Sequence, residues 1–449
     1  MRSSTPKMLH PLCGRPMVLW PVIAATEAGV GRVVVVTSPG LDLSAVLPDS
    51  VETVVQEESD GTGGAVRAAS EAISDSAEVL ILCGDVPLMS AEVIADFLGA
   101  HRESGAAATV LTTVLDDPGS YGRIIRDGEG QIERIVEAKV DGDGTAEELA
   151  VKEVNSGAYV FGGEALLEAL AGLDDDNAQG EHYLTDAIAG LRSAGREVGG
   201  WTADDPAVNM GINDLAQLSL VEAEARRRIA ERHMLAGVTV VDPGSTWIDA
   251  DVTIGPDARI EPGTSLKGAT EIGDGATIGP HSTVVDSGIG SRSMVVHSYL
   301  NLCEVLADCS VGPFAYLRPG TELSDGAKAG TFVELKNSRI GEGAKVPHLS
   351  YVGDAEVGAG ANLGAGTITA NYDGVRKHRT VIGPGARLGV DTMLVAPVEV
   401  GEDAWTGAGA VIREDVPPGS LAVTGDRQRT IEDYNERRRS EDVKKESDR

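Results

Sequence analysis

The sequence predicts an α/β doubly wound, Rossmann-like nucleotidyltransferase domain followed by an all-β left-handed parallel β-helix of hexapeptide repeats. In the first half, stretches typical of buried strands alternate with stretches typical of helices. In the second half, an aliphatic residue returns at every sixth position, usually with a small residue, mostly glycine, directly after it. A period of six fits neither a helix of 3.6 residues per turn nor an alternating strand. It is typical of a coil of short parallel strands, each with one side chain pointing inward.

The six-residue period predicts which side chains line the interior of the β-helix. They are Ile254, Ile260, Leu266, Ile272, Ile278 and Val284, then Val305, Val311, Leu317 and Leu323, then Ile340, Val346 and Val352, and finally Ile382, Leu388, Leu394, Val400, Thr406 and Ile412. A β-sandwich with evenly spaced turns is the alternative, but the number of hexads in step favours the β-helix. Residues 237–424 would give roughly ten turns of about 18 residues each.

The alternation in the first half predicts βαβ crossovers and a doubly wound sheet in a domain of residues 1–214. Predicted strands cover residues 33–36, 51–55, 79–82, 107–115, 123–125, 132–136 and 154–160, and predicted helices cover 17–28, 184–192 and segments from 62 and 90. A linker helix rich in Glu and Arg is predicted over 215–236. Residues 425–449 are predicted to form a charged tail without apolar periodicity.

Composition limits the partners and the compartment. The net charge of −32 argues against a nucleic-acid backbone or an anionic membrane as a general partner. The four cysteines form no CxxC pair, which indicates reduced thiols in a cytoplasmic protein. No apolar run approaches the length that spans a membrane.

Polar residues in the first domain stand where parallel sheets bind ligands, beyond the carboxyl ends of strands. Asp85 follows a predicted strand and could bind Mg²⁺ together with a phosphate, or simply cap a turn. The stretch 56–63 lies between a strand and a helix, and offers backbone amides to a base or a phosphate, or forms a plain glycine-rich turn. Lys7 follows a proline in a loop, where an isolated lysine is usually a solvated charge.

In the second half, polar residues interrupt the hexads. Arg318 and Lys336 are cations on a strongly acidic protein and suit a sugar phosphate, although surface salt bridging is the alternative. His348 stands two residues after the inward-facing Val346, so we expect it to face outward. A histidine there can accept a proton at neutral pH, or be an ordinary surface residue.

Taken together, the motifs resemble one family. TPKMLHPLCGRPM, QEESDGTGGA, CGDVPL, YGRI, IVEAK, VNSGAYVF, EHYLTD and MGINDLAQL follow one another as in the bacterial bifunctional N-acetylglucosamine-1-phosphate uridyltransferase / glucosamine-1-phosphate N-acetyltransferase. The second half agrees through TWIDADVTIG, GPFAYLRPGTEL, FVELKNSRIG, PHLSYVGDAEVG and ANYDG. The resemblance covers nearly the whole chain. It implies a bifunctional enzyme that makes UDP-N-acetylglucosamine for cell-wall synthesis from glucosamine 1-phosphate, acetyl-CoA and UTP.

One departure from the family concerns the start of the chain. A first strand and a nucleotide loop of the form LAAGxGTRM should precede RSSTPK, but Met1 falls where that loop ends. We therefore expect a natural product longer by roughly twenty residues, about one strand plus its loop. If the short form is real, uridyl transfer should be weak or absent, which leaves an acetyltransferase or a trimeric scaffold as the alternative function.

The resemblance also implies the residues of the first site. Asp85 and Asn213 match Mg²⁺ ligands, and Lys7 matches a phosphate-contacting lysine. The positions that match nucleotide or sugar contacts are Gln56, Gly61, Thr62, Gly122, Glu137 and Asn155. The implied chemistry is in-line attack by the sugar phosphate on the α-phosphorus of UTP, with pyrophosphate leaving.

For the second site, the resemblance implies that His348 is the general base that deprotonates the amine of glucosamine 1-phosphate. The sugar-phosphate positions are Arg318, Lys336, Tyr351 and Asn362, and the acetyl-CoA positions are Ala365, Asn371, Tyr372, Val390 and Ala408. Val390 stands where a serine is usual, and Gly425 near where a basic residue can occur. We also hypothesise that the basic run of residues 376–379 meets the phosphates of CoA.

The family assembles as a homotrimer, and outward apolar residues such as Phe314, Phe332 and Trp405 would fit a buried interface. Two other enzymes with a β-helix are weighed against this family. A nucleotidyltransferase of the ADP-glucose type has a short β-helix without PHLSYVGDAE. A zinc enzyme of the γ-carbonic anhydrase kind needs three converging histidines, and those of this sequence show no such grouping.

Overall fold

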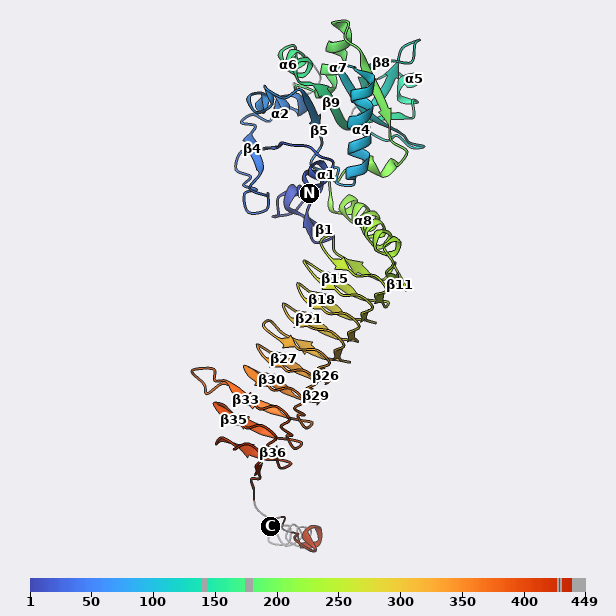
Figure 1. The fold of residues 1–449 in the computed structure, drawn as a ribbon. Coiled ribbons are helices and arrows are strands. Elements are labelled where there is room, and N and C mark those ends of the chain that lie inside the picture. Colours follow the sequence, from blue (N-terminus) through green and yellow to red (C-terminus); the bar gives the residue numbers. More distant parts are fainter. Residues whose placement is uncertain (139–143, 174–180, 426–427, 429, 438–449) are drawn as a thin grey trace, which may run out of the picture. The chain divides into compact units, whose positions relative to one another are not determined.

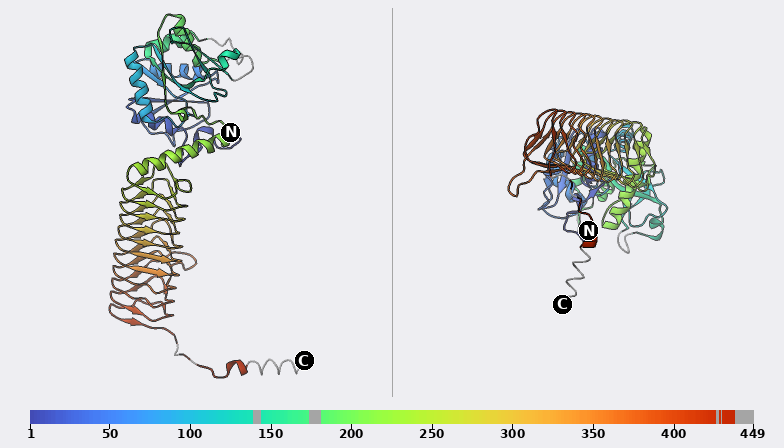
Figure 2. Two further views of the ribbon diagram at one scale, coloured as in Figure 1. Left: turned by 90° about the vertical axis from the view of Figure 1, so that its right-hand side faces the viewer. Right: turned by 90° about the horizontal axis from the view of Figure 1, so that it is seen from below.

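The structure is a computed structural model that describes residues 1–138, 144–173, 181–425, 428 and 430–437. The chain separates into two units, one made of Met1–Arg232 with Ile248–Asp251, the other of His233–Trp247 with Val252–Arg449. The first unit is α/β and the second is a stack of β-coils (Figures 1 and 2). The predicted charged tail lies largely outside the described residues.

A mixed six-stranded sheet forms the centre of the first unit. Its strands are β5 (Glu78–Ile81), β6 (Ala108–Val114), β7 (Arg123–Arg126), β8 (Ile132–Val136), β9 (Glu153–Gly162) and β10 (Val198–Thr202). The order is β10-β6-β9-β7-β8, and β5 pairs with β9. Strands β3 (Val33–Thr37) and β4 (Val51–Val55) form a separate parallel pair, and β1 (Pro11–Leu12) pairs with β2 (Arg15–Pro16).

The α/β class is confirmed, but the sheet differs from the predicted parallel one in two strands. The long strand β9 runs antiparallel to β5, β6 and β7, and β8 runs antiparallel to β7. The register between β6 and β9 shifts near Gly157, which has a φ of 74°. Glycine adopts this left-handed conformation without strain, which accommodates the irregular pairing at this point of the sheet.

Helices α4, α6 and α7 pack against the sheet of the first unit. The helices of the described residues are η1 (Lys7–Leu9), α1 (Leu19–Glu27), α2 (Thr62–Ala68), α3 (Ser70–Ile73), α4 (Ala91–Ser104), α5 (Ala146–Leu149), α6 (Gly163–Ala171), α7 (Leu184–Ser193), η2 (Pro206–Asn209) and α8 (Leu215–Leu235), and the division between the units falls within α8. Capping residues set the two ends of helix α4. Ser90 caps its first turn, and Gly105, with a φ of 66°, ends it. The apolar side of α4 is buried through Ile94, Phe97 and Leu98.

Three parallel sheets form the sides of the β-helix. The first holds β11 (Thr239–Val240), β14 (Arg259–Ile260), β17 (Thr277–Ile278), β20 (Met294–Val295), β23 (Ser310–Val311), β26 (Lys328–Thr331) and β29 (Lys345–His348). The second holds β12 (Trp247–Ile248), β15 (Ser265–Lys267), β18 (Thr283–Val285), β21 (Tyr299–Asn301), β24 (Tyr316–Leu317), β27 (Glu334–Lys336), β30 (Tyr351–Gly353), β32 (Ile368–Ala370), β34 (Met393–Val395) and β37 (Val411–Ile412).

The third sheet holds β13 (Thr253–Ile254), β16 (Glu271–Ile272), β19 (Gly288–Ile289), β22 (Glu304–Val305), β25 (Glu322–Leu323), β28 (Arg339–Ile340), β31 (Ala355–Val357), β33 (Thr380–Ile382) and β35 (Val398–Val400). Strands β36 (Trp405–Thr406) and β38 (Leu421–Ala422) pair beyond the first sheet. The inward positions predicted from the hexads are buried except Ile254, which is half-buried. Each coil therefore adds aliphatic side chains to one continuous core.

Candidate active sites

The first candidate site is centred on Lys7. Its ammonium donates hydrogen bonds to Asp85 Oδ2 at 2.6 Å and to Asn213 Oδ1 at 3.2 Å. The Lys7 and Asp85 side chains are each 30% exposed, so ligands can reach the pair. A carboxylate oxygen and an amide oxygen therefore converge on one cation. This donor set fits Mg²⁺, which prefers oxygen ligands and keeps several waters.

Two loops bring Asp85 and Asn213 together. Asp85 lies just beyond the end of β5, and its carbonyl accepts a hydrogen bond from the amide of Ile212 at 3.0 Å. Asn213 stands just before α8, and its amide donates to Gln217 Oε1 at 2.7 Å. The metal-ligand positions predicted from the resemblance, remote in sequence, thus lie side by side.

The predicted nucleotide positions form a second group, in the loop before α2. Gln56 Nε2 donates to Asp60 Oδ1 at 2.7 Å and to the carbonyl of Gly61 at 3.1 Å. Gly61 has a φ of 100°, and a Cβ there would lie 2.6 Å from the carbonyl oxygen of His182. The Thr62 hydroxyl accepts from the amide of Leu184 at 3.1 Å. The segment around residues 182–184 therefore fixes the shape of this loop.

Of the predicted sugar positions, Asn155 lies on β9, Gly122 directly precedes β7 and Glu137 directly follows β8. The amide of Asn155 donates to the carbonyl of Gly122 at 2.8 Å, and Asn155 Nδ2 donates to the Tyr159 hydroxyl at 2.7 Å. Burial raises the pKa of Tyr159, so this hydroxyl stays protonated. Glu137, directly after β8, accepts a hydrogen bond from the Thr185 hydroxyl at 3.3 Å. Gly122 and Asn155 are therefore in contact, and Glu137 is held by α7.

The second candidate site lies on the β-helix around His348. This residue ends β29 and is exposed, whereas Val346, two positions earlier, is fully buried. The outward orientation predicted from the hexad period is therefore confirmed. The next coil passes close by, because the amide of Gly366 donates to the carbonyl of His348 at 3.3 Å.

A cluster of charges lies on the neighbouring strands β27 and β30. Lys336 Nζ is 3.8 Å from Asp354 Oδ2, and Asn371 and Asn337 donate hydrogen bonds to the two oxygens of the same carboxylate. Burial alone would raise the pKa of Asp354, but these amides and the Lys336 charge hold it below its ordinary value. The ammonium of Lys336 in turn lowers the pKa of Lys377. The charges of Lys336, Lys377 and Asp354 therefore influence one another on this part of the surface.

Other predicted sugar-phosphate residues flank this cluster. Arg318 pairs with Glu334 at 2.8 Å, and Glu334 is the register partner of Tyr351. Asn362 lies instead on the His348 side of the corner, where it bridges to Lys345 and Arg387. The fold therefore distributes these predicted positions over two adjoining faces of the β-helix.

The small residues predicted at the acetyl-CoA site stack at one corner of successive coils. The amide of Asp391 donates to the carbonyl of Ala365 at 2.7 Å, and the amide of Gly409 donates to the carbonyl of Val390 at 2.8 Å. A Cβ on Gly389 would lie 2.7 Å from the amide nitrogen of Ala408. Ala365, Val390 and Ala408 thus form a column that begins beside His348.

The loop that breaks the hexad period joins β32 to β33. Tyr372 is exposed, and its hydroxyl donates to the carbonyl of Gly374 at 2.6 Å. His378 pairs with Asp373 at 2.6 Å and Arg379 with Glu356 at 2.7 Å, so both partners are local. Lys336 lowers the pKa of Lys377, which places Lys377 within electrostatic reach of the Lys336 charge. The role of residues 376–379 at the CoA phosphates stays a prediction.

Asp354, Lys377, Gln217 and Tyr159 were not singled out for these roles in the sequence. Asp354 and Asn371 are on different coils, and only the spacing of coils brings them together. A signal existed for Lys377, since it lies in the loop that interrupts the hexads, but the sequence did not indicate which face of the β-helix it joins.

Comparison with known proteins decides the family. Residues 1–192 match the MobA-like NTP transferase domain, and residues 251–286 match the bacterial transferase hexapeptide (six repeats). The chain is 47% identical to the bifunctional protein GlmU of Streptomyces avermitilis, over 98% of this chain and 92% of that protein. It is 48% identical to GlmU of Kineococcus radiotolerans, over 97% and 89%. It is 46% identical to GlmU of Mycobacterium tuberculosis, over 98% and 90%.

This chain belongs to the bifunctional GlmU family. The predicted resemblance is thereby confirmed along both halves of the chain. Membership of the GlmU family also decides against the ADP-glucose type of nucleotidyltransferase and the zinc enzyme, which were weighed on the sequence. Among the described residues, no helix has the length and apolar character needed to cross a membrane.

Proposed function

We propose that this chain makes UDP-N-acetylglucosamine in two reactions. It transfers the acetyl group of acetyl-CoA to the amine of glucosamine 1-phosphate. It then transfers a uridyl group from UTP to N-acetylglucosamine 1-phosphate and releases pyrophosphate. The observation that carries this conclusion is the identity of 46–48% to GlmU proteins over 97–98% of the chain. A nucleotidyltransferase domain and a hexapeptide domain in one chain fit the two reactions.

For acetyl transfer, His348 acts as the general base. It takes a proton from the amine of glucosamine 1-phosphate, the amine attacks the thioester carbon of acetyl-CoA, and CoA leaves as its thiol. Positioned general bases contribute typically 10²–10⁴-fold to rate. The exposed position of His348 at the end of β29 supports this role, because a ligand on the outer face can reach the imidazole.

Lys336 and Lys377 hold the phosphate of glucosamine 1-phosphate. Two ammonium groups close enough for Lys336 to lower the pKa of Lys377 repel each other unless an anion lies between them. Arg318, Tyr351 and Asn362 complete the sugar-phosphate site on the adjoining strands. Acetyl-CoA runs along the column of Ala365, Val390 and Ala408, where the two alanines permit close approach, and reaches Asn371 and Tyr372.

For uridyl transfer, Asp85 and Asn213 hold Mg²⁺. The metal ion supplies neutralisation of negative charge on the phosphates of UTP. Lys7 contacts the phosphates, so its ammonium must leave the two oxygens to which it now donates. Gln56, Gly61 and Thr62 contact the nucleotide, and Gly122, Glu137 and Asn155 bind the sugar. Since the sugar phosphate is itself the nucleophile, no protein base is required.

The assembly, the domain limits and the compartment belong to the same proposal. The active form is a homotrimer, with the β-helix as the assembly domain. Residues 1–214 carry uridyl transfer, residues 215–236 are the linker and residues 237–424 carry acetyl transfer. The enzyme works in the cytoplasm, consistent with four cysteines without disulfides.

The test uses two variants of the full chain, each of which should lose one of the two activities and keep the other. Purified protein is assayed separately for CoA release from acetyl-CoA with glucosamine 1-phosphate, and for pyrophosphate release from UTP with N-acetylglucosamine 1-phosphate. His348→Ala should lower the first rate by roughly 10²–10⁴-fold and leave the second unchanged. Asp85→Asn should do the reverse. A wild-type chain that fails either assay would refute that half of the function.

A further inference from the structure

We propose that Arg228 is a positioning residue for the pair of Mg²⁺ ligands Asp85 and Asn213. The inference rests on the proposed uridyl-transfer site and adds to it a residue of α8 that touches neither metal nor substrate. Arg228 is 26% exposed and lies in the middle of the helix that begins directly after Asn213. Neither the sequence motifs nor the family match assigns it a role.

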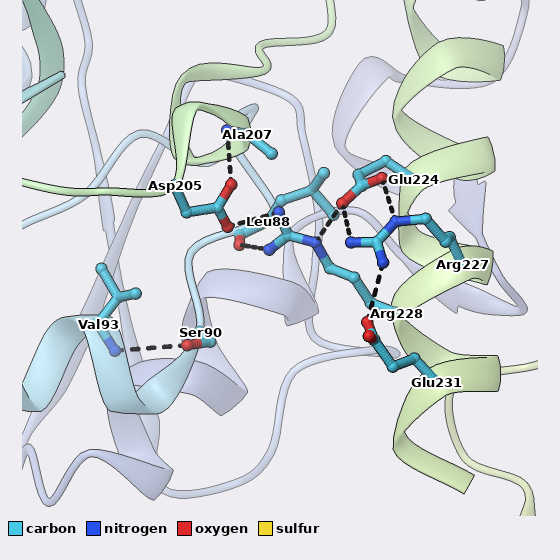
Figure 3. A network of polar contacts seen from close by, with 9 residues as sticks. All are labelled: Leu88, Ser90, Val93, Asp205, Ala207, Glu224, Arg227, Arg228 and Glu231. Carbon is cyan, nitrogen blue, oxygen red and sulfur yellow. Dashed lines mark hydrogen bonds and ion pairs between the residues drawn. The ribbon is translucent and has the colours of Figure 1, made fainter. Parts of the chain in front are cut away.

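The guanidinium of Arg228 holds two separate segments (Figure 3). Its Nη1 donates to the carbonyl of Leu88 at 3.1 Å, and its Nη2 donates to Asp205 Oδ2 at 2.6 Å. Its Nε donates to Glu224 Oε1, one turn earlier on α8, at 2.7 Å. Each of the three guanidinium nitrogens of Arg228 therefore donates to one acceptor. The bond to Glu224, on the same helix, holds the Arg228 side chain in this rotamer.

Each of the two segments leads directly to one ligand. Leu88 lies three residues after Asp85, and Ser90, two residues later, caps α4. Asp205 caps η2 by accepting from the amide of Ala207 at 3.0 Å, and the chain then runs from η2 to Asn213. The amide of Ile212 bonds to the carbonyl of Asp85 beside the ligands. Arg228 forms a further cross-link between the same two segments, at their far ends.

The two segments are also joined by the packing of Met89 and Val208 in one buried cluster and by Lys7, which bonds to both ligands. Arg228 adds a polar cross-link at the ends of the segments away from Lys7, and its fork donates to Leu88 and Asp205 in two fixed directions. An ammonium is a point charge that does not match both acceptors. Residues that orient metal ligands typically cost 10–100-fold in metal affinity when they are lost.

Arg227 offers a matched control on the same helix. Its guanidinium pairs with Glu224 at 2.9 Å and with Glu231 at 2.8 Å, both within α8, and it is 57% exposed. The two arginines share charge, helix and the Glu224 partner (Figure 3). They differ in that Arg228 reaches Leu88 and Asp205. Arg227→Met thus reproduces the loss of helix salt bridging without the loss of the cross-link.

The experiment compares Arg228→Met, Arg228→Lys and Arg227→Met in the full chain. We expect Arg228→Met to raise the Mg²⁺ concentration for half-maximal pyrophosphate release by about tenfold, with most of the rate restored at saturating Mg²⁺. Arg228→Lys should lie between Arg228→Met and wild type, and Arg227→Met should match wild type. Acetyl transfer, assayed in the same samples, should be unchanged in all three.

Two measurements without turnover complete the test. Mn²⁺ binding in the presence of UTP, followed by electron paramagnetic resonance, should weaken about tenfold in Arg228→Met alone. Amide hydrogen exchange should quicken in residues 85–90 and 205–213 of that variant. If Arg227→Met and Arg228→Met give the same Mg²⁺ and Mn²⁺ dependence, Arg228 has no positioning role. If wild type releases no pyrophosphate, uridyl transfer fails, while Mn²⁺ binding and hydrogen exchange still decide on Arg228.

Discussion

At the scale of the residue, the pair of Lys336 and Lys377 makes binding of a sugar phosphate depend on pH. The pKa of Lys377 lies below its ordinary value of 10.5 because of the neighbouring ammonium. A lysine with a lowered pKa loses its charge as pH rises through that value, at a lower pH than an ordinary lysine would. Attraction for a phosphate should therefore weaken on the alkaline side before pH 10.5 is reached.

We predict that product inhibition of acetyl transfer by N-acetylglucosamine 1-phosphate weakens between neutral pH and pH 10.5. N-acetylglucosamine 1-phosphate has no titrating amine, so a change in amine charge on the ligand does not contribute to the pH dependence of inhibition. Lys377→Arg should remove the weakening, because a guanidinium stays charged throughout this range. An inhibition constant that rises equally in wild type and Lys377→Arg would show that another group is responsible.

Glu224 on α8 gives a prediction for stability. Hydrogen bonds from Arg227 and then Arg228, opposed by burial, lower its pKa from 4.5 to about 2. A carboxyl group with a lowered folded pKa contributes stability above its unfolded pKa and loses that contribution as pH falls through the folded value. The contribution should thus be complete above pH 4.5 and disappear toward pH 2.

We therefore expect Glu224→Gln to lower the melting temperature of the first unit at pH 7, by an amount equivalent to on the order of 1 kcal/mol or less. The difference from wild type should shrink as pH falls from 4.5 toward 2. Calorimetric melting curves at several pH values measure it. A constant difference across this range would mean that Glu224 acts through packing rather than charge.

At the scale of the element, strand β27 has one buried aliphatic side chain between two charged side chains that point outward. Leu335 is fully buried, whereas its neighbours Glu334 and Lys336 face outward to the proposed sugar-phosphate site. Alternation along a strand makes this division unavoidable. The same three residues therefore fix the core at one coil and present charge on its surface.

Leu335→Ala should destabilise the β-helix by about 2–5 kcal/mol, the usual cost of a cavity in a packed core. The temperature at which acetyl transfer is lost on heating should fall, while that for uridyl transfer should stay the same. Leu335→Met keeps the volume and should cost less than about 1.5 kcal/mol. Equal loss of both activities in Leu335→Ala would contradict separate folding of the two units.

At the scale of the whole molecule, we predict that one column of side chains on the β-helix forms the interface of the proposed homotrimer. The column consists of the rings of His281, His297, Phe314 and Phe332 together with Leu349, and all five residues have positive φ. The rings of Phe314 and Phe332 stack at 5.4 Å, and these two side chains remain 56% and 58% exposed. Adjacent large apolar side chains on a surface are typical of an interface.

We predict that Phe332→Asp dissociates the proposed homotrimer. Sedimentation equilibrium should then give the mass of one chain, whereas Leu220→Asp, a matched change at an apolar side chain on the first unit that is 65% exposed, should leave assembly intact. Acetyl transfer should fall with dissociation and uridyl transfer should persist. A trimeric Phe332→Asp variant would place the interface on another face.

The sequence alone determined the class of both units, the approximate bounds of several elements of the first unit and the inward side of the coils. Strands β4 and β8 and the start of α7 fall at the predicted residues, because local periodicity and capping fix them without reference to distant parts. The outward position of His348 follows from the same period. The family match tests the function, and the roles of the individual site residues stay predictions.

Tertiary structure decided what local pattern cannot encode. The antiparallel insertion of β9, the meeting of Lys336 with Lys377 and the grip of Arg228 on Leu88 and Asp205 all join residues far apart in the chain. Such contacts depend on which strand enters the sheet beside which, and on how many residues each coil or loop contains. A period of six fixes the direction of a side chain, but only the completed stack of coils fixes its neighbour.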